Sequence, residues 1–309
     1  MNIRPLNIRS ALASEPPALD FVLPGLLSGT AGTIVGSGGI GKTTLLLQVS
    51  MALSSNMPVG GQIFSMASQP SRVVFVAAEE SADIMRIRLH AINDSMKQQQ
   101  APLLSLETGE DTVSLMENNL CLLPAAGHSV SLLKNGEPTA FYDELCKLCH
   151  GARLIVIDPL RRLHDGEENS SATMTQLVQL LESLAKRTGA AVIAAHHINK
   201  GAAFAGMTDL ATASRGSSAL TDAVRWQVNL SAMSEPEAKA FGLTAERKSY
   251  LRLDFAKANY MPSQPTIWMK RLDGGALTQV DLSASSATKT RTSGKSNSRV
   301  PGKGEVTYV

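Results

Sequence analysis

Short apolar runs alternate with segments of helical periodicity along most of this chain. The runs are rich in β-branched and aromatic residues and predict buried strands at 21–23, 33–35, 72–78, 152–157 and 190–195. Residues 43–53 are apolar nearly all round, and apolar positions at helical spacing predict further helices at 84–92, 141–149 and 174–184. Ser81 is placed to cap the first of these, and Gly189 to end the last. Such alternation predicts a mostly parallel sheet with helices on both faces.

The C-terminal third has a period of two instead. Val224, Trp226, Val228 and Leu230 alternate with polar residues, which predicts a half-buried strand carrying Arg225 on its polar face. The pattern repeats at 251–255, and 273–275 reads Asp-Gly-Gly, a predicted hairpin turn between 267–271 and 276–277. We expect these last strands to extend the sheet in antiparallel fashion.

Composition suggests three segments. Residues 1–20 predict an extended lead-in, residues 21–282 one folded ATPase domain, and residues 283–309, rich in Ser, Thr, Lys, Arg and Gly, a flexible basic tail. Within the domain, 97–136 is irregular apart from a short apolar run near Leu120, and is interpreted as an insertion or surface excursion.

The overall composition is that of a globular protein. The chain has 309 residues, of which 43% are hydrophobic and 18% charged, so a mainly disordered or collagen-like chain is excluded. A net charge of +2 neither requires nor excludes a nucleic-acid partner. Three cysteines without an export segment favour a reducing cytoplasm, and no apolar stretch is long enough to span a membrane.

One motif predicts ATP and Mg²⁺ as cofactors. Residues 36–43 read G-S-G-G-I-G-K-T between a strand and an apolar helix, as in a loop whose backbone N–H groups surround phosphates. Lys42 would reach the terminal phosphate and the Thr43 hydroxyl would ligate Mg²⁺. The same glycines fit the dinucleotide pattern G-x-G-x-x-G, a weaker alternative because no acid follows about 20 residues on. The predicted nucleotide-binding residues are Gly36, Ser37, Gly38, Gly39, Ile40, Gly41, Lys42, Thr43 and Thr44.

Acidic residues end two of the predicted strands. Asp158 is the candidate for a second Mg²⁺ contact. Glu79 follows the strand after the phosphate-loop helix, where a carboxylate can orient and deprotonate the attacking water. Glu80 competes for this role, and one of the two is interpreted as a charge that favours a helix N-terminus. We prefer Glu79.

Basic residues suggest a phosphate sensor and a residue acting on a neighbouring subunit. His196 and His197 end a strand at the same sheet edge, and at most one of them points to the nucleotide. Arg225 is the first candidate for an arginine that reaches the γ-phosphate of a neighbouring subunit, with Arg215 and Lys257 second.

Cys146 and Cys149 are spaced as in a metal or redox motif. Both fall in a predicted amphipathic helix and no second C-x-x-C exists, so buried core thiols are the preferred interpretation.

The order of motifs resembles the RecA-like ATPase core. Several stretches also resemble the RepA family, the hexameric replicative DNA helicases of broad-host-range mobilisable plasmids. They are D-P-L-R-R-L-H-D-G-E-E-N-S-S (158–171), H-H-I-N-K-G-A-A (196–203), A-S-R-G-S-S-A-L (213–220), V-R-W-Q (224–227) and K-A-N-Y (257–260).

The resemblance implies a homo-hexamer with ATP at each subunit interface and single-stranded DNA in a central channel. It assigns the base to Glu79, the phosphate sensor to His197 and the finger that acts in trans to Arg225. Residues 199–214 would face the channel, with Lys200 and Arg215 as DNA-binding cations. Larger relatives carry a K-x-R pair near the last strand, whereas here Lys257 is followed by Ala258 and Asn259.

The leading hypothesis is therefore an ATP-driven DNA helicase of plasmid or mobile-element replication, with replication initiation proteins or origin DNA as further partners. The alternative is a RecA-like regulatory or partitioning ATPase that acts on a protein without unwinding DNA. A small-molecule kinase is disfavoured because no arginine-rich lid is visible in the sequence.

Overall fold

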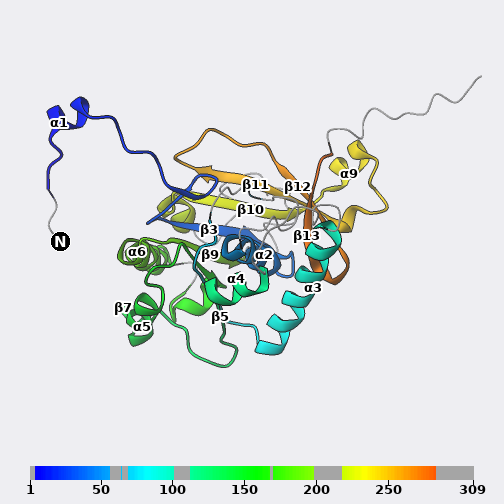
Figure 1. Ribbon diagram of the computed structural model, residues 1–309, viewed down its shortest axis with the longest axis horizontal. Coiled ribbons are helices and arrows are strands. Elements are labelled where there is room, and N and C mark those ends of the chain that lie inside the picture. Colours follow the sequence, from blue (N-terminus) through cyan, green and yellow to red (C-terminus); the bar gives the residue numbers. More distant parts are fainter. Residues whose placement is uncertain are drawn as a thin grey trace, which may run out of the picture.

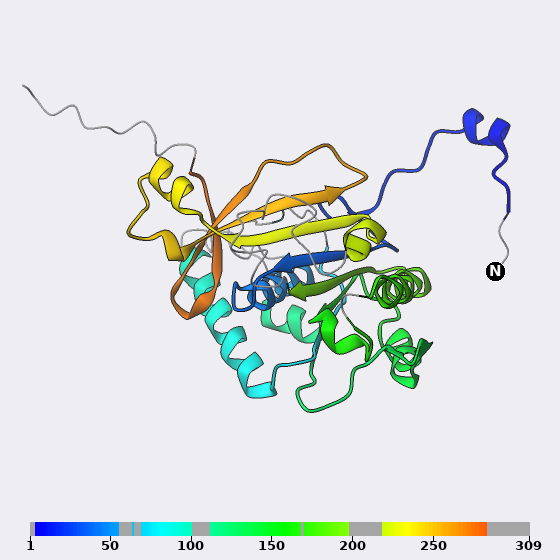
Figure 2. The same ribbon diagram turned by 180° about the vertical axis from the view of Figure 1, so that it is seen from behind.

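A computed structural model describes residues 4–55, 64, 69–100, 112–167, 170–197 and 218–282. A nine-stranded sheet with helices on both faces forms its body (Figures 1 and 2). The order across the sheet is β13-β12-β11-β10-β3-β9-β8-β4-β5. Six neighbouring strands from β10 to β5 run parallel, and β11, β12 and β13 continue the sheet antiparallel from β10. The α/β class predicted from the sequence is confirmed.

The elements have the following bounds. The sheet strands are β3 (Ala31–Gly36), β4 (Val73–Ala77), β5 (Leu120–Pro124), β8 (Leu154–Asp158), β9 (Ala191–His197), β10 (Trp226–Ala232), β11 (Tyr250–Ala258), β12 (Ile267–Arg271) and β13 (Leu277–Val280). Two small hairpins are β1 (Phe21–Leu23) with β2 (Leu26–Leu27), and β6 (Leu133–Lys134) with β7 (Glu137–Pro138). The α-helices are α1 (Ile8–Ala13), α2 (Lys42–Ser55), α3 (Ala82–Gln100), α4 (Thr112–Asn119), α5 (Ala140–Leu148), α6 (Ser171–Thr188), α8 (Ser218–Ala223) and α9 (Glu235–Phe241). Short 3-10 turns are η1 (Leu160–Leu163), η3 (Arg247–Ser249) and η4 (Asp273–Gly275).

Two apolar clusters fill the space between the sheet and its helices. One joins α2 and α3 to one face of the sheet, and the other joins α5, α6 and α8 to the opposite face. Helix α2 is buried at every residue except Thr43, as its apolar composition predicts. Helix α6 has the single apolar stripe of a surface helix and ends at Gly189, whose φ of 76° suits a residue without a side chain.

Three expectations about local structure were wrong. The first concerns residues 97–136, which are not merely an irregular excursion: the run from Leu120 forms edge strand β5, parallel to β4. An edge strand is paired on one side only and is half buried, so its apolar signal is short. The second concerns the lead-in, in which α1 forms a six-residue helix with no buried residue, at the end of an arm that projects from the body (Figure 1).

The third wrong expectation is the half-buried strand near residue 226. β10 begins at Trp226, so Arg225 lies just before it and is exposed. The strand is an interior one, paired with β3 on one side and β11 on the other, and its polar residues Gln227 and Asn229 are buried. The Gln227 side-chain amide donates to Asn229 Oδ1 at 2.9 Å. Period two therefore marked two differently lined buried faces.

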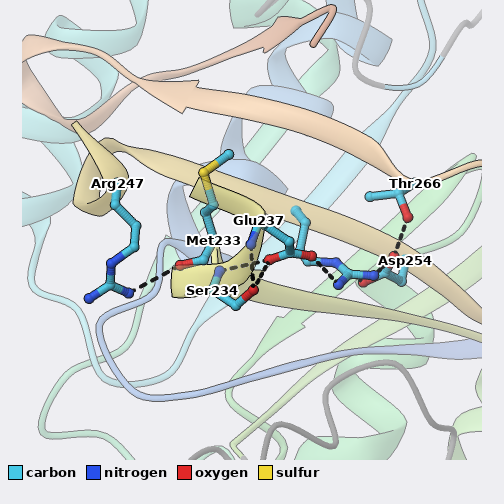
Figure 3. A network of polar contacts seen from close by, with 7 residues as sticks. Met233, Ser234, Glu237, Arg247, Asp254 and Thr266 are labelled. Atoms are coloured by element: carbon cyan, nitrogen blue, oxygen red, sulfur yellow. Dashed lines mark hydrogen bonds and ion pairs between the residues drawn. The ribbon is translucent and has the colours of Figure 1, made fainter. Parts of the chain in front are cut away.

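A polar network fastens α9 to the antiparallel strands (Figure 3). Ser234 caps α9 by accepting from the Glu237 backbone N–H, and the Glu237 carboxylate accepts from the Ser234 backbone N–H at 2.7 Å, which is a capping box. Arg252 on β11 donates to Glu237 at 2.5 Å and to Asp254 at 2.9 Å. Thr266 then donates to Asp254 at 2.6 Å, so one chain of contacts joins α9 to the approach to β12.

None of the helices in the described ranges combines the length and the apolar character that crossing a bilayer requires. The proposed tail at 283–309 lies outside the described residues, and the division into lead-in, domain and tail stays a prediction.

Candidate nucleotide site

A pocket of about 430 Å³ opens where β3, β4, β8 and β9 end. Ligands of open α/β sheets bind at the carboxyl ends of parallel strands, which is where this pocket lies. It is lined by Gly39, Gly41, Lys42, Thr43, Thr44, Glu79, Glu80, Arg88, Asp158, Pro159, His197, Arg271 and Gly275. Residues of the phosphate loop thus share one pocket with Glu79, Asp158 and His197.

Two glycines allow the phosphate loop to adopt its shape. Gly36 ends β3, and a Cβ added there would lie 2.6 Å from the Leu230 carbonyl oxygen, so any side chain would push β10 away from β3. Gly41 has a φ of 113°, a conformation that L-residues with a side chain rarely adopt. Helix α2 starts at the next residue and directs its N-terminal N–H groups at the pocket.

Lys42 lies beneath the pocket with only 4% of its surface exposed. Its ammonium donates to the Gly36 and Ser37 carbonyl oxygens at 2.8 and 3.0 Å and lies 3.1 Å from His197 Nδ1. Desolvation lowers the pKa of Lys42 to about 8, although the Asp158 carboxylate opposes the shift. A phosphate would supply the anion that this buried cation lacks.

Asp158 and Thr43 form the oxygen pair of a predicted Mg²⁺ site. Asp158 is buried at the end of β8, and its carboxylate is hydrogen-bonded to the Thr43 side chain. Burial raises the pKa of Asp158, while the Thr43 hydrogen bond and the Lys42 charge oppose that rise. Carboxylate and hydroxyl oxygens next to bound phosphates are the ligands that Mg²⁺ prefers, so these two residues fit the ion and would hold it.

Glu79 and Glu80 both line the pocket, each paired with a different arginine. Glu80 Oε1 accepts from Arg88 of α3 at 2.6 Å, and Arg88 also donates to Thr44 Oγ1 at 3.3 Å. Glu79 Oε1 accepts from Arg162 Nε of η1 at 2.8 Å, and both side chains are about half exposed. Arg88 fixes Glu80 against the inner wall, whereas Glu79 lies at the rim. The assignment of the base to Glu79 stays a prediction.

The two histidines at the end of β9 lie in different environments. His197 lines the pocket beside Lys42, and His196 points to the opposite face, where it is buried. Desolvation lowers the pKa of His196 to about 4, so it is neutral at physiological pH. Of the pair, only His197 is positioned to respond to a bound phosphate.

Comparison with known proteins places the chain in a family. A family model described as an AAA domain, AAA_25, matches residues 2–203. The chain belongs to the AAA_25 family. The match and the complete phosphate loop support an ATP hydrolase.

Three solved structures resemble this AAA domain in fold. The first is the ATPase domain of a replicative helicase, with 16% identity over 82% of this chain and 86% of that one and a TM-score of 0.59. A DnaB-like replicative helicase, solved for its interactions with primase, has 16% identity over 82% of this chain and 58% of its own, with a TM-score of 0.58. The RadB recombinase has 15% identity over 83% of this chain and 93% of its own, with a TM-score of 0.51. The AAA domain therefore has a RecA-like P-loop fold.

Arg225 and Lys257 of the AAA domain lie apart from its own pocket. Arg225 is exposed before β10, and its carbonyl accepts from Asn259 N–H at 3.2 Å. The Lys257 ammonium donates to the Thr221 and Asp222 carbonyl oxygens at 2.9 and 3.0 Å, at the end of α8. Lys257 is thus engaged within its own subunit. Lys200 and Arg215 lie outside the described residues, and their DNA-binding role stays a prediction.

Sequence reasoning missed two arginines of the pocket. Arg271 ends β12 and donates from Nη2 to the Ile40 carbonyl of the phosphate loop at 2.6 Å, and Arg88 contacts Glu80 and Thr44 as described. A basic residue at the end of a strand and before an Asp-Gly-Gly turn was the available signal for Arg271. Nothing local ties it to a loop more than 200 residues earlier.

The two cysteines of the C-x-x-C pair are buried, as expected. Burial raises the pKa of Cys149 to about 12 and also raises the pKa of Cys146, so both are thiols at neutral pH. Within the described ranges, no group of three or more His, Cys, Asp or Glu side chains is arranged to hold a metal ion.

Proposed function

We propose that this protein is an ATP-driven, ring-forming DNA helicase that moves along single-stranded DNA and separates duplex in plasmid or mobile-element replication. Six copies would form the ring, with each nucleotide pocket at a subunit interface.

The observation that carries the proposal is the contact between the phosphate loop and the end of β9. His197 Nδ1 lies 3.1 Å from the Lys42 ammonium, and the segment proposed to touch DNA begins two residues later, at 199. A phosphate that binds Lys42 competes for this contact, so His197 gives the site a means of moving the residues that follow it. The likeness in fold to replicative helicase ATPase domains supports the same reading.

Each pocket residue then has a proposed part in hydrolysis. Lys42 and the N-terminal N–H groups of α2 bind the phosphates, and Thr43 and Asp158 hold Mg²⁺, which supplies charge neutralisation at the phosphates. Glu79 at the rim orients the attacking water and accepts its proton. Arg225, exposed and outside its own pocket, is free to complete the pocket of a neighbour.

Strand separation on a forked duplex, with ATPase rates measured with and without single strands, tests the proposal. We expect ATP-dependent unwinding, stimulation by the strand, and a hexamer in native mass spectrometry. Lys200→Ala should weaken single-strand binding and lower its salt slope by about 0.7. Lys147→Ala, which removes an exposed lysine from α5, is the matched control. Absence of both unwinding and stimulation contradicts the helicase.

Mixing two inactive variants tests the trans role of Arg225. Arg225→Ala keeps its own Glu79 and lacks the finger, whereas Glu79→Gln keeps the finger and lacks the base. In a mixed ring, an Arg225→Ala pocket next to a Glu79→Gln subunit has both groups, so activity should return on mixing. No recovery means that Arg225 does not act across an interface.

The alternative, a RecA-like regulatory or partitioning ATPase, keeps the same nucleotide pocket. It predicts full ATPase activity with no response to single strands and no effect of Lys200→Ala.

A further inference from the structure

A second cavity, of about 530 Å³, lies beside the nucleotide pocket and shares Glu79 as a wall. It opens at the same carboxyl edge of the sheet, where the chain leaves β4, β5 and β8. Its basic lining comes from His128, Lys134, Arg161, Arg162 and His164. Nothing proposed so far uses these residues.

The cavity is held by backbone contacts between two distant segments. Leu132 N–H donates to the Leu163 carbonyl at 2.7 Å, and Leu133 forms a parallel bridge with His164. Asn135 N–H donates to the Asp165 carboxylate, at 3.2 Å from one of its oxygens. The segment carrying Lys134 is therefore fixed against η1, which carries Arg161 and Arg162.

Two cations of this cavity lack a carboxylate partner. Within the described ranges neither Lys134 nor Arg161 forms an ion pair, and both are exposed. Of the two acids in the lining, Asp165 accepts from Asn135 and Glu79 accepts from Arg162. The cavity thus offers unpaired positive charge next to a single, half-exposed ion pair, and Lys and Arg are the side chains that contact backbone phosphates.

We propose that this cavity binds a backbone phosphate of a nucleic-acid strand, and that the bound phosphate draws Arg162 away from Glu79. The idea rests on the proposed role of Glu79 as the base. While Arg162 holds Glu79 Oε1 at 2.8 Å, one carboxylate oxygen is engaged outside the nucleotide pocket. A phosphate beside Lys134 and Arg161 competes for the Arg162 guanidinium, because charge-assisted Arg–phosphate contacts are strong. The strand then releases Glu79 toward the attacking water.

Linkage makes the effect reciprocal: if the strand favours the released Glu79, a nucleotide that engages Glu79 tightens binding of the strand by the same factor. An exposed ion pair of this kind shifts an equilibrium by up to about fivefold. Arg162 is a positioning residue, since it lines the second cavity and not the nucleotide pocket.

The first experiment measures binding of fluorescein-labelled oligo(dT) by anisotropy, without nucleotide, over a range of salt concentrations. The double variant Lys134→Ala/Arg161→Ala should lower the salt slope by about 1.4, the value expected for two lost contacts to a single strand. The control Lys147→Ala/Lys186→Ala removes two exposed lysines from α5 and α6 and should leave the slope unchanged. Equal slopes for the two double variants overturn the site. So does stimulation of ATP hydrolysis by inorganic phosphate, if oligo(dT) has no effect.

The second experiment separates positioning from fold. Arg162→Gln should raise kcat without the strand by about twofold to fivefold, leave KM for ATP unchanged, and abolish further stimulation by oligo(dT). Arg162→Lys keeps an ion pair and should retain the low basal rate. A fall in basal kcat for Arg162→Gln, or continued stimulation by the strand, refutes the coupling. If the protein binds oligo(dT) as described yet fails to separate a fork, the helicase fails and the phosphate site stands.

Discussion

Replacing Lys42 by methionine should make the nucleotide-free protein more stable while abolishing ATP binding. Only 4% of the Lys42 surface is exposed, and desolvation lowers its pKa from 10.5 to about 8. At about 1.36 kcal/mol per pKa unit, keeping this cation charged in the folded state costs about 3 kcal/mol at neutral pH. Methionine has similar length and no charge. The Gly36 and Ser37 carbonyls lose a donor, but they border an open pocket where water can replace it.

The pH dependence gives the sign. A lysine whose folded pKa lies below its unfolded pKa loses its proton first in the folded state, so the unfolded state binds more protons between about pH 8 and pH 10.5. Stability of the natural protein therefore rises with pH in that window. Lys42→Met lacks this term, so its advantage should be about 3 kcal/mol near pH 7 and should shrink by about 1 kcal/mol near pH 9.

Urea unfolding followed by the fluorescence of Trp226 and Trp268 measures these differences. Lys248→Met, at an exposed lysine of η3, is the control and should change stability by no more than about 0.5 kcal/mol. A Lys42→Met protein that is less stable than the natural one near pH 7, or a difference independent of pH, would refute this account of the buried ammonium.

Three further substitutions test the pocket and one cap. Glu79→Gln should lower kcat by about 100-fold to 10,000-fold, whereas Glu80→Gln should lower it by less than about 10-fold; steady-state ATPase assays decide, and the reverse order would move the base to Glu80. Asp158→Asn should reduce ATP hydrolysis by at least about 100-fold without loss of stability in urea, since burial already disfavours its charge; retained hydrolysis would remove Asp158 from the metal site. Ser234→Ala should destabilise the protein by about 1 kcal/mol through loss of the α9 cap, and Ser234→Gly by a few tenths; equal losses in urea unfolding would contradict the capping role.

The parts of the fold that could be predicted are those whose sequence signal is local. The apolar runs at β3, β4, β8 and β9 are buried on both faces, so they need no knowledge of their neighbours to be read as strands. The phosphate loop, Asp158 and His197 could be placed at one edge because parallel strands present their carboxyl ends together.

What could not be predicted depends on pairing between distant segments. Alternation at 224–230 fits a half-buried strand, and only the neighbours β3 and β11 turn it into an interior one. The contacts of Glu79 with Arg162 and of Ile40 with Arg271 depend likewise on where separate elements meet.

The tie between α2 and the last hairpin bears on the order in which the protein matures during synthesis. Buried Gln48 receives both of its partners from Leu277: its amide donates to the Leu277 carbonyl and its oxygen accepts from the Leu277 N–H, each at 2.8 Å. Arg271 in the same hairpin supports the Ile40 carbonyl. A nascent chain that ends before Leu277 leaves Gln48 without these partners in an apolar setting. The ribosome therefore makes the phosphate loop early, yet its scaffold is completed only when the final strand emerges.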